Sequence, residues 1–151
     1  MFKGKRLLAF WGFVWLAGPV LAFAQVQFDG AEYTLPLPSG RGKGDVYEGT
    51  LRFDKDRKEV QFLSKGGSVP LRVKYNAIKS MLYERTARPR YALTVLAFLS
   101  KSKKHYLTID YTDVLGARQF AVIRLDKDNY REVLATAEAE TGKKVDRTEE
   151  R

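Results

Sequence analysis

The chain has 151 residues, a formal net charge of +9 at pH 7 and no cysteine. A disulfide framework is therefore excluded, so the fold must be held together by core packing alone. Once a leader of 24 residues is set aside, the remaining 127 residues support one domain with a single core.

Residues 1–24 have the pattern of a secretory signal peptide. Three bases precede the uncharged run LLAFWGFVWLAGPVLAFA, and small residues at Ala22 and Ala24 suit cleavage before Gln25. The run of 18 residues is at the lower limit for spanning a bilayer, which favours cleavage over an uncleaved anchor. We therefore expect an exported protein, periplasmic or extracellular, that is peripheral to the membrane where it binds one.

The positive charge is concentrated in one part of the chain. Without the leader, 24 basic and 18 acidic residues remain, which gives a net charge of +6. Residues 61–104 contain ten Lys and Arg residues and a single acid, Glu84, so the net charge of this window is +9. The rest of the mature chain sums to −3, and the positive field is therefore local.

Residues 25–44 are expected to form a strand arm followed by a linker. A turn is predicted at Asp29-Gly30, within a short hairpin or strand whose apolar positions are Val26, Phe28, Tyr33, Leu35 and Leu37. The next segment, SGRGKGD, alternates glycines with bases but lacks the spacing and the strand-to-helix context of a phosphate-binding loop. It is therefore predicted to be a flexible linker.

From Asp45 onward, alternation of apolar and polar residues predicts β-strands. The segments YEGTLRFD, EVQFLS and VPLRVKY, separated by two turns, are expected to form an antiparallel meander with an apolar inner face. NAIKSM predicts one helical turn, and LYERTA predicts a further strand. YLTIDYTD and RQFAVIRLD, joined by a turn at 113–116, predict a hairpin.

The chain is expected to close on an amphipathic helix. Asp126 or Asp128 can cap its first turn, and Gly142 is placed to end it. The apolar residues with helical spacing are Tyr130, Val133, Leu134 and Ala137. Residues 146–151 are expected to fray.

Five segments together suggest a fold: YEGTLRFD, EVQFLS, VPLRVKYNAIKSMLYER, YLTIDYTD and KDNYREVLATAEAETG. In this order they resemble the pleckstrin-homology-like (PH-like) domains of bacteria, which are related to GRAM domains. The resemblance covers about 45–145 and implies a mainly β fold. It implies a bent antiparallel barrel of about seven strands, with one open corner plugged by the C-terminal helix.

The stretch 88–105 contains the candidate binding surface. Its uncharged residues 91–99 lie between two basic clusters. Burial of five large apolar side chains is worth about 8 to 15 kcal/mol, too much to leave them in water. They are either part of the core, as a strand or helix packed on the barrel, or they enter a lipid interface while the flanking bases bind anionic headgroups. A contact with a protein partner or a second copy is the third alternative.

We therefore expect a binding module of the cell envelope that associates with an anionic membrane surface. The alternative is a protein-interaction or homo-oligomerisation module whose apolar segment is core or interface, with an envelope protein as the partner. The candidate binding residues are Arg88, Arg90, Leu93, Leu96, Phe98, Leu99, Lys101, Lys103 and Lys104.

The sequence predicts no enzyme, cofactor or metal site. His105 is the only histidine, and the chain has no nucleophile elbow. The charges of Lys103 and Lys104 favour its neutral form, and we expect it to be an incidental surface residue. Nucleic acid is not an expected partner, because aromatic residues are not interleaved with the bases and the leader removes the protein from the cytoplasm.

Overall fold

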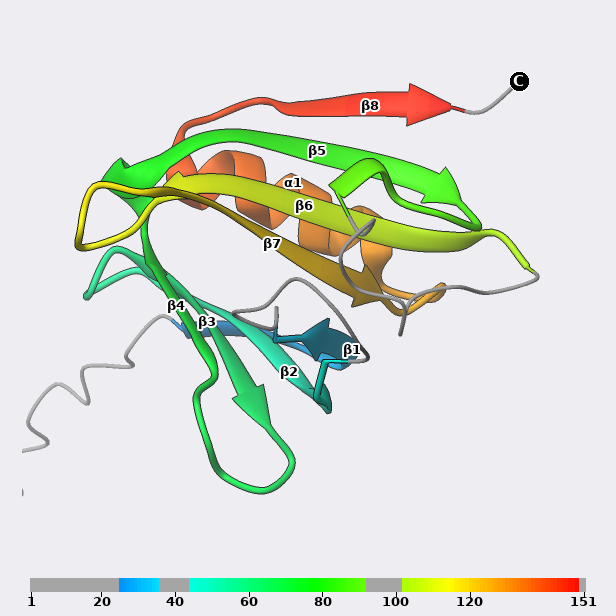
Figure 1. Cartoon of the computed structure of the whole chain (residues 1–151), viewed down its shortest axis with the longest axis horizontal. Helices are drawn as coiled ribbons and strands as arrows, with labels where there is room; N and C mark the ends of the chain where they lie inside the picture. Colours follow the sequence, from blue (N-terminus) through cyan, green and yellow to red (C-terminus); the bar gives the residue numbers. More distant parts are fainter. Residues whose placement is uncertain (1–24, 36–43, 92–101, 150–151) are drawn as a thin grey trace, which may run out of the picture.

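The computed structural model describes residues 25–35, 44–91 and 102–149, and these form one mixed sheet of eight strands and one α-helix (Figure 1). The sheet order is β4-β3-β2-β1-β7-β6-β5-β8. The elements are β1 (Gln25–Thr34), β2 (Val46–Asp54), β3 (Glu59–Ser64), β4 (Leu71–Lys74), a 3-10 turn η1 (Tyr75–Ala77), β5 (Ile78–Thr86), β6 (Lys104–Thr112), β7 (Arg118–Leu125), α1 (Tyr130–Thr141) and β8 (Val145–Glu149).

The two halves of the sheet share a single core. Alternation places Leu51, Phe53 and Phe62 on the inner face of β2 and β3, while Leu107 and Ile109 occupy the inner face of β6. The helix α1 packs into the same core with Val133, Leu134 and Ala137. The predicted meander of β2, β3 and β4, the short turn after it, the β6–β7 hairpin and the closing helix are all confirmed.

The N-terminal strand is an interior strand and not an arm outside the domain. β1 pairs with β2 along its length and with β7 at Glu32 and Tyr33, so the expected boundary at residue 45 falls inside one sheet. The prediction of a turn at Asp29-Gly30 is wrong. The structure has a β-bulge there, which shifts the register of β1 against β2. Gly30 has a φ of +76°, a backbone conformation that favours glycine.

The expected barrel is corrected in two respects. Among the described strands, β4 pairs only with β3 and β8 pairs only with β5, so the sheet has two edges and is not closed. The eighth strand, β8, lies parallel to β5, and the sheet is therefore mixed.

The tail 146–151 was expected to fray, but residues 146–149 belong to β8, and residues 150–151 lie outside the described residues. Val145 is buried in the core, and its N–H donates to Glu138 Oε1 at 2.9 Å. The residues that follow, DRTE, show no apolar alternation. They pair with β5 through the backbone, and this pairing does not require an apolar face.

The helix ends as predicted but begins differently. Gly142 adopts a left-handed conformation at the C-terminus of α1, and its N–H donates to the Glu138 carbonyl at 3.0 Å. Neither aspartate caps the first turn, since Asn129 precedes the helix and Asp126 Oδ1 instead accepts the N–H of Asp128 at 2.8 Å. Within the described ranges, no helix has the length and apolar character needed to cross a membrane.

Candidate functional site

The described bases of the candidate stretch lie at one end of the molecule, where β5 ends and β6 begins. The antiparallel register places Arg85 opposite His105 and Thr86 opposite Lys104, while β7 brings Leu125 beside His105. Three cavities of about 530, 390 and 370 Å³ open here, and all of them have Arg85 in their walls. We call this region the basic cleft.

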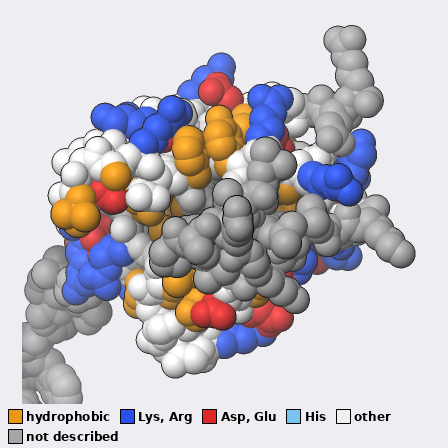
Figure 2. Space-filling view, in the orientation of Figure 1, with side chains coloured by type: hydrophobic (Ala, Val, Ile, Leu, Met, Phe, Trp, Pro, Cys, Tyr) orange, Lys and Arg blue, Asp and Glu red, His pale blue; other side chains and the backbone are white. Residues whose placement is uncertain are grey.

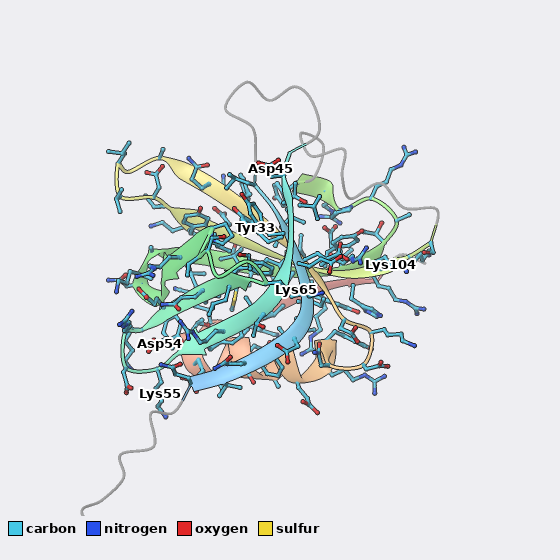
Figure 3. All side chains as sticks on the ribbon, turned by 90° about the horizontal axis from the view of Figure 1, so that it is seen from below. Tyr33, Asp45, Asp54, Lys55, Lys65 and Lys104 are labelled. Atoms are coloured by element: carbon cyan, nitrogen blue, oxygen red, sulfur yellow. The ribbon has the colours of Figure 1, made fainter. Side chains whose placement is uncertain are left out.

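The lining of the basic cleft is strongly cationic. Its acids are Asp126 and Asp128, and its seven bases are Arg85, Lys103, Lys104, Arg124, Lys127, Arg131 and Arg147. Lys and Arg side chains occur along several borders of the face in Figure 2, including the upper border over β5 and β8 and the right-hand border. Lys104 lies at the end of the molecule opposite to Lys55 of the β2–β3 turn (Figure 3). The basic cleft and the β2–β3 turn therefore lie at opposite ends of the molecule.

Several of these bases are not neutralised. Arg124 pairs with Glu32, and Arg147 lies 3.8 Å from a carboxylate oxygen of Glu138. In the part of the chain that the structure describes, four others have no acidic partner: Arg85, Lys104, Lys127 and Arg131. Their charge is available to an anionic ligand.

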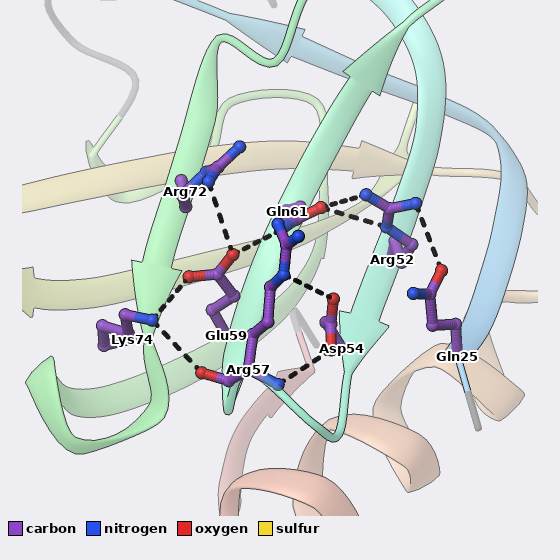
Figure 4. A network of polar contacts seen from close by, with 8 residues as sticks. All are labelled: Gln25, Arg52, Asp54, Arg57, Glu59, Gln61, Arg72 and Lys74. Atoms are coloured by element: carbon purple, nitrogen blue, oxygen red, sulfur yellow. Dashed lines mark hydrogen bonds and ion pairs between the residues drawn. The ribbon is translucent and has the colours of Figure 1, made fainter. Parts of the chain in front are cut away.

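A second group of bases, on the outer face of β2, β3 and β4, provides a contrast (Figure 4). Here Glu59 is 1% exposed and lies 2.9 Å from Lys74 and 3.7 Å from Arg72. Burial would raise the pKa of Glu59, but hydrogen bonds from Lys74 and Gln61 outweigh burial and hold the pKa below its ordinary value. On this face two bases share the carboxylate of Glu59, whereas four bases of the basic cleft have no acidic partner in the part of the chain that the structure describes.

The floor of the basic cleft is a group of three stacked rings. His105 stacks on Tyr130 with centroids 3.9 Å apart, and Tyr83 stacks on Tyr130 at 5.6 Å. The Tyr83 hydroxyl and His105 Nδ1 are hydrogen-bonded at 2.7 Å. Arg131 covers this group, because its Nε donates to the Tyr130 hydroxyl at 3.0 Å and its guanidinium lies 5.6 Å from the centre of the ring.

The surroundings of His105 favour its neutral form. Burial lowers the pKa of His105 below its ordinary value of 6.5. The positive charges of Arg85, Arg131 and Lys104 lower the pKa further, while Asp126 opposes them. An anion in the basic cleft would reverse the effect of these bases and favour the imidazolium.

The nine candidate residues divide into three groups. Lys103 and Lys104 line the basic cleft. Arg90 is paired with the buried Glu84 at 3.1 Å, and Arg88 uses its backbone N–H to reach the Thr86 hydroxyl. Five candidates lie outside the described residues: Leu93, Leu96, Phe98, Leu99 and Lys101.

The only described residue of the apolar run packs on the sheet. Tyr91 stacks on Phe120 of β7, with ring centroids 4.3 Å apart. The Arg118 guanidinium lies on the same Phe120 ring, 4.9 Å from its centre. The first residue of the apolar run is therefore in contact with the sheet.

Most of the basic cleft is not visible in local sequence patterns. His105 was expected to be an incidental surface residue, but it is half-buried and stacks on Tyr130, with Tyr83 also in the ring group. Arg85 and Arg131 come from β5 and α1, and no local sequence pattern connects them. The signal that could have found them is the strand register, which places Arg85 opposite His105.

Comparisons with known proteins add little to this description. No family model matches the chain, and no curated protein matches it. One similar solved structure is that of the Spt16D Pob3N heterodimer, with 13% sequence identity and a TM-score of 0.48. The match covers 85% of this chain and 56% of that chain, so this chain spans little more than half of its length. The class that the coordinates define is a mainly β domain with one mixed eight-stranded sheet and one C-terminal helix.

Proposed function

We propose that this protein is an exported, non-enzymatic binding module that associates with an anionic membrane surface through the basic cleft. The observation that carries the proposal is the imbalance of its lining, where seven bases meet two acids. Four of these bases lack an acidic partner among the described residues. Uncompensated bases at one end of a small domain orient that end toward an anionic surface.

The fold that we assign to this module is PH-like. Support comes from the meander of β2, β3 and β4, the second group β5, β6 and β7, and the closing helix α1. The assignment of export rests on the leader pattern of residues 1–24, which precede the first described strand.

The basic cleft refines the surface that the sequence suggested. Arg90 contributes less than expected, because Glu84 already compensates its charge. As binding residues we propose three other bases, which line one cavity: Arg85, Lys127 and Arg131. Each uncompensated base near an anionic surface is worth about 1 kcal/mol, and this contribution falls as salt shortens the Debye length.

Vesicle flotation tests the proposal. We expect the protein to float with phosphatidylglycerol vesicles at low salt, to be released as salt is raised, and to remain in solution with neutral phosphatidylcholine vesicles. Replacing two bases of the basic cleft, Arg85→Gln with Arg131→Gln, should weaken binding roughly 30-fold, because two contributions of about 1 kcal/mol are lost.

The matched control removes two exposed bases that do not line the cleft, Lys55→Gln with Lys144→Gln. Lys55 lies at the opposite end of the molecule, and Lys144 precedes Val145, which pairs with Met81, four residues before Arg85 in β5. An equal loss of binding in this control would show that only net charge matters, and the basic cleft would not be the site. Wild-type protein that is folded but binds no vesicle would contradict the membrane proposal.

The alternative that would then stand is a protein-interaction module. It is favoured by Val114 and Leu115 at the tip of the β6–β7 hairpin, which are 102% and 90% exposed. Asp113 fixes this turn, because its Oδ1 accepts the N–H groups of Leu115 and Ala117 at 2.9 and 2.8 Å. A rigid turn that presents two apolar side chains is suited to an apolar groove on a partner.

A further inference from the structure

We propose that the basic cleft is a pocket for a phosphate monoester, with Arg85, Lys127 and Arg131 on the phosphoryl oxygens and His105 as a further donor. This inference rests on the proposed function and names the chemical class of the ligand. It is carried by one cavity of about 390 Å³, whose wall contains all four side chains.

The charge of this cavity matches a monoester better than a diester. Its three bases face one acid, Asp128, so the charged side chains of its wall sum to +2. A phosphate monoester carries close to two negative charges at pH 7 and presents three terminal oxygens. A diester carries one charge and presents two free oxygens, so it leaves donors of this cavity without an acceptor.

His105 is oriented for this role by two contacts. Its Nδ1 is held by the Tyr83 hydroxyl at 2.7 Å, and its ring is held against Tyr130 at 3.9 Å. No described residue makes a hydrogen bond with Nε2, the other nitrogen of the ring. When the Tyr83 hydroxyl donates to Nδ1, Nε2 carries the hydrogen and can donate it to a ligand oxygen.

Arg131 is positioned without being neutralised. Its Nε donates to the Tyr130 hydroxyl at 3.0 Å, and the terminal nitrogens of the guanidinium have no acidic partner in the described ranges. A guanidinium held in this way can use its two terminal nitrogens, as a fork, for bidentate contact with two phosphoryl oxygens. Arg85, from β5, supplies a second guanidinium.

The neighbouring cavity can accept the organic part of the ligand. Its volume is about 530 Å³, and Tyr83, Tyr130 and Leu134 supply apolar surface to its wall. Arg85 and Arg131 line both cavities. A phosphoryl group bound to them in the smaller cavity would therefore direct its ester oxygen toward the apolar wall of the larger one. This volume is within the usual range of small-ligand sites, about 300 to 1,000 Å³.

Flotation with two anionic lipids tests the inference. Vesicles containing phosphatidic acid, a monoester, and phosphatidylglycerol, a diester, are matched in zeta potential so that the surface field is equal. We expect wild-type protein to bind phosphatidic acid about tenfold more tightly, the effect of one charge-assisted hydrogen bond. His105→Asn should lower the ratio of the two affinities to about one, because the donor that favours the monoester is lost, with its melting temperature recorded as the test of folding.

A soluble ligand separates a lipid headgroup from a free phosphate monoester. Because His105 is the only histidine, untagged protein gives a single imidazole NMR signal. We expect glycerol 3-phosphate to shift this signal saturably and dimethyl phosphate to leave it in place. Arg131→Lys, which keeps the charge and loses the fork, should weaken the saturable shift even if His105→Asn fails to fold.

The possible outcomes distinguish this inference from the proposed function. Equal binding of both anionic lipids would overturn the monoester pocket and leave the membrane proposal intact. No binding to either vesicle, together with a saturable shift by glycerol 3-phosphate, would overturn the membrane proposal and support a soluble monoester. An imidazole signal that responds to neither soluble ligand would overturn the inference.

Discussion

At the scale of single residues, the pKa of His105 depends both on its burial in the fold and on the bases of the basic cleft. Burial, together with Arg85, Arg131 and Lys104, lowers the pKa of His105, while Asp126 opposes the shift. The folded state therefore binds the proton of His105 less tightly than the unfolded state, whose pKa is close to 6.5. This contribution to stability is complete above pH 6.5 and is lost as pH falls through the folded pKa.

We expect the melting temperature of the ligand-free protein to fall between pH 6.5 and pH 5. His105→Asn should show a shallower fall over the same interval, because asparagine does not titrate. The comparison uses thermal unfolding followed by circular dichroism at several pH values. Identical slopes for the two proteins would contradict the role given to His105. A ligand phosphate should reduce the wild-type slope, since it favours the imidazolium.

At the scale of elements, β8 has the clearest consequence for stability. Val145 is 1% exposed, whereas Val114 at the β6–β7 tip is fully exposed, so the two valines form a matched pair. Val145→Ala should lower the free energy of unfolding by about 2 kcal/mol, because a buried side chain is shortened and a cavity is left. Val114→Ala should change it by less than about 0.5 kcal/mol. Urea unfolding measures both, and equal effects would mean that β8 does not belong to the folded core.

The elements also divide into those that the sequence could predict and those that it could not. The strands β2, β3, β4, β6 and β7 were predictable because each has one apolar face. The strand β8 was not, because only Val145 enters the core and the rest pairs through the backbone. The bulge in β1 was read as a turn, since Gly30 has the same left-handed backbone in both.

The candidate site was less predictable than the fold. Lys103 and Lys104 were found because they adjoin the apolar run in sequence. Arg85 and Arg131 were not predictable, because their presence in one cavity depends on the β5–β6 register and on the position of α1, both of which are long-range features. Stacking of Tyr83, His105 and Tyr130 likewise joins three separate elements.

At the scale of the whole molecule, we expect the protein to bind a surface in one orientation. The basic cleft lies at one end, and the β2–β3 turn with Lys55 lies at the other (Figure 3). A surface bound by the basic cleft would therefore contact the first turn of α1 and leave the β2–β3 turn in water. Arg72 and Lys74 on the outer face of β4 would contribute less, because both are paired with the buried Glu59.

The most direct measurement is the fluorescence of a polarity-sensitive label at each end of the molecule. The chain has no cysteine, so Glu132→Cys beside Arg131 and Asp56→Cys in the β2–β3 turn each create one labelling site, and each removes one exposed acid. With phosphatidylglycerol vesicles at low salt, we expect a blue shift for the label at position 132 and none at position 56. Equal shifts at both positions, or a shift at position 56 alone, would contradict binding through the basic cleft.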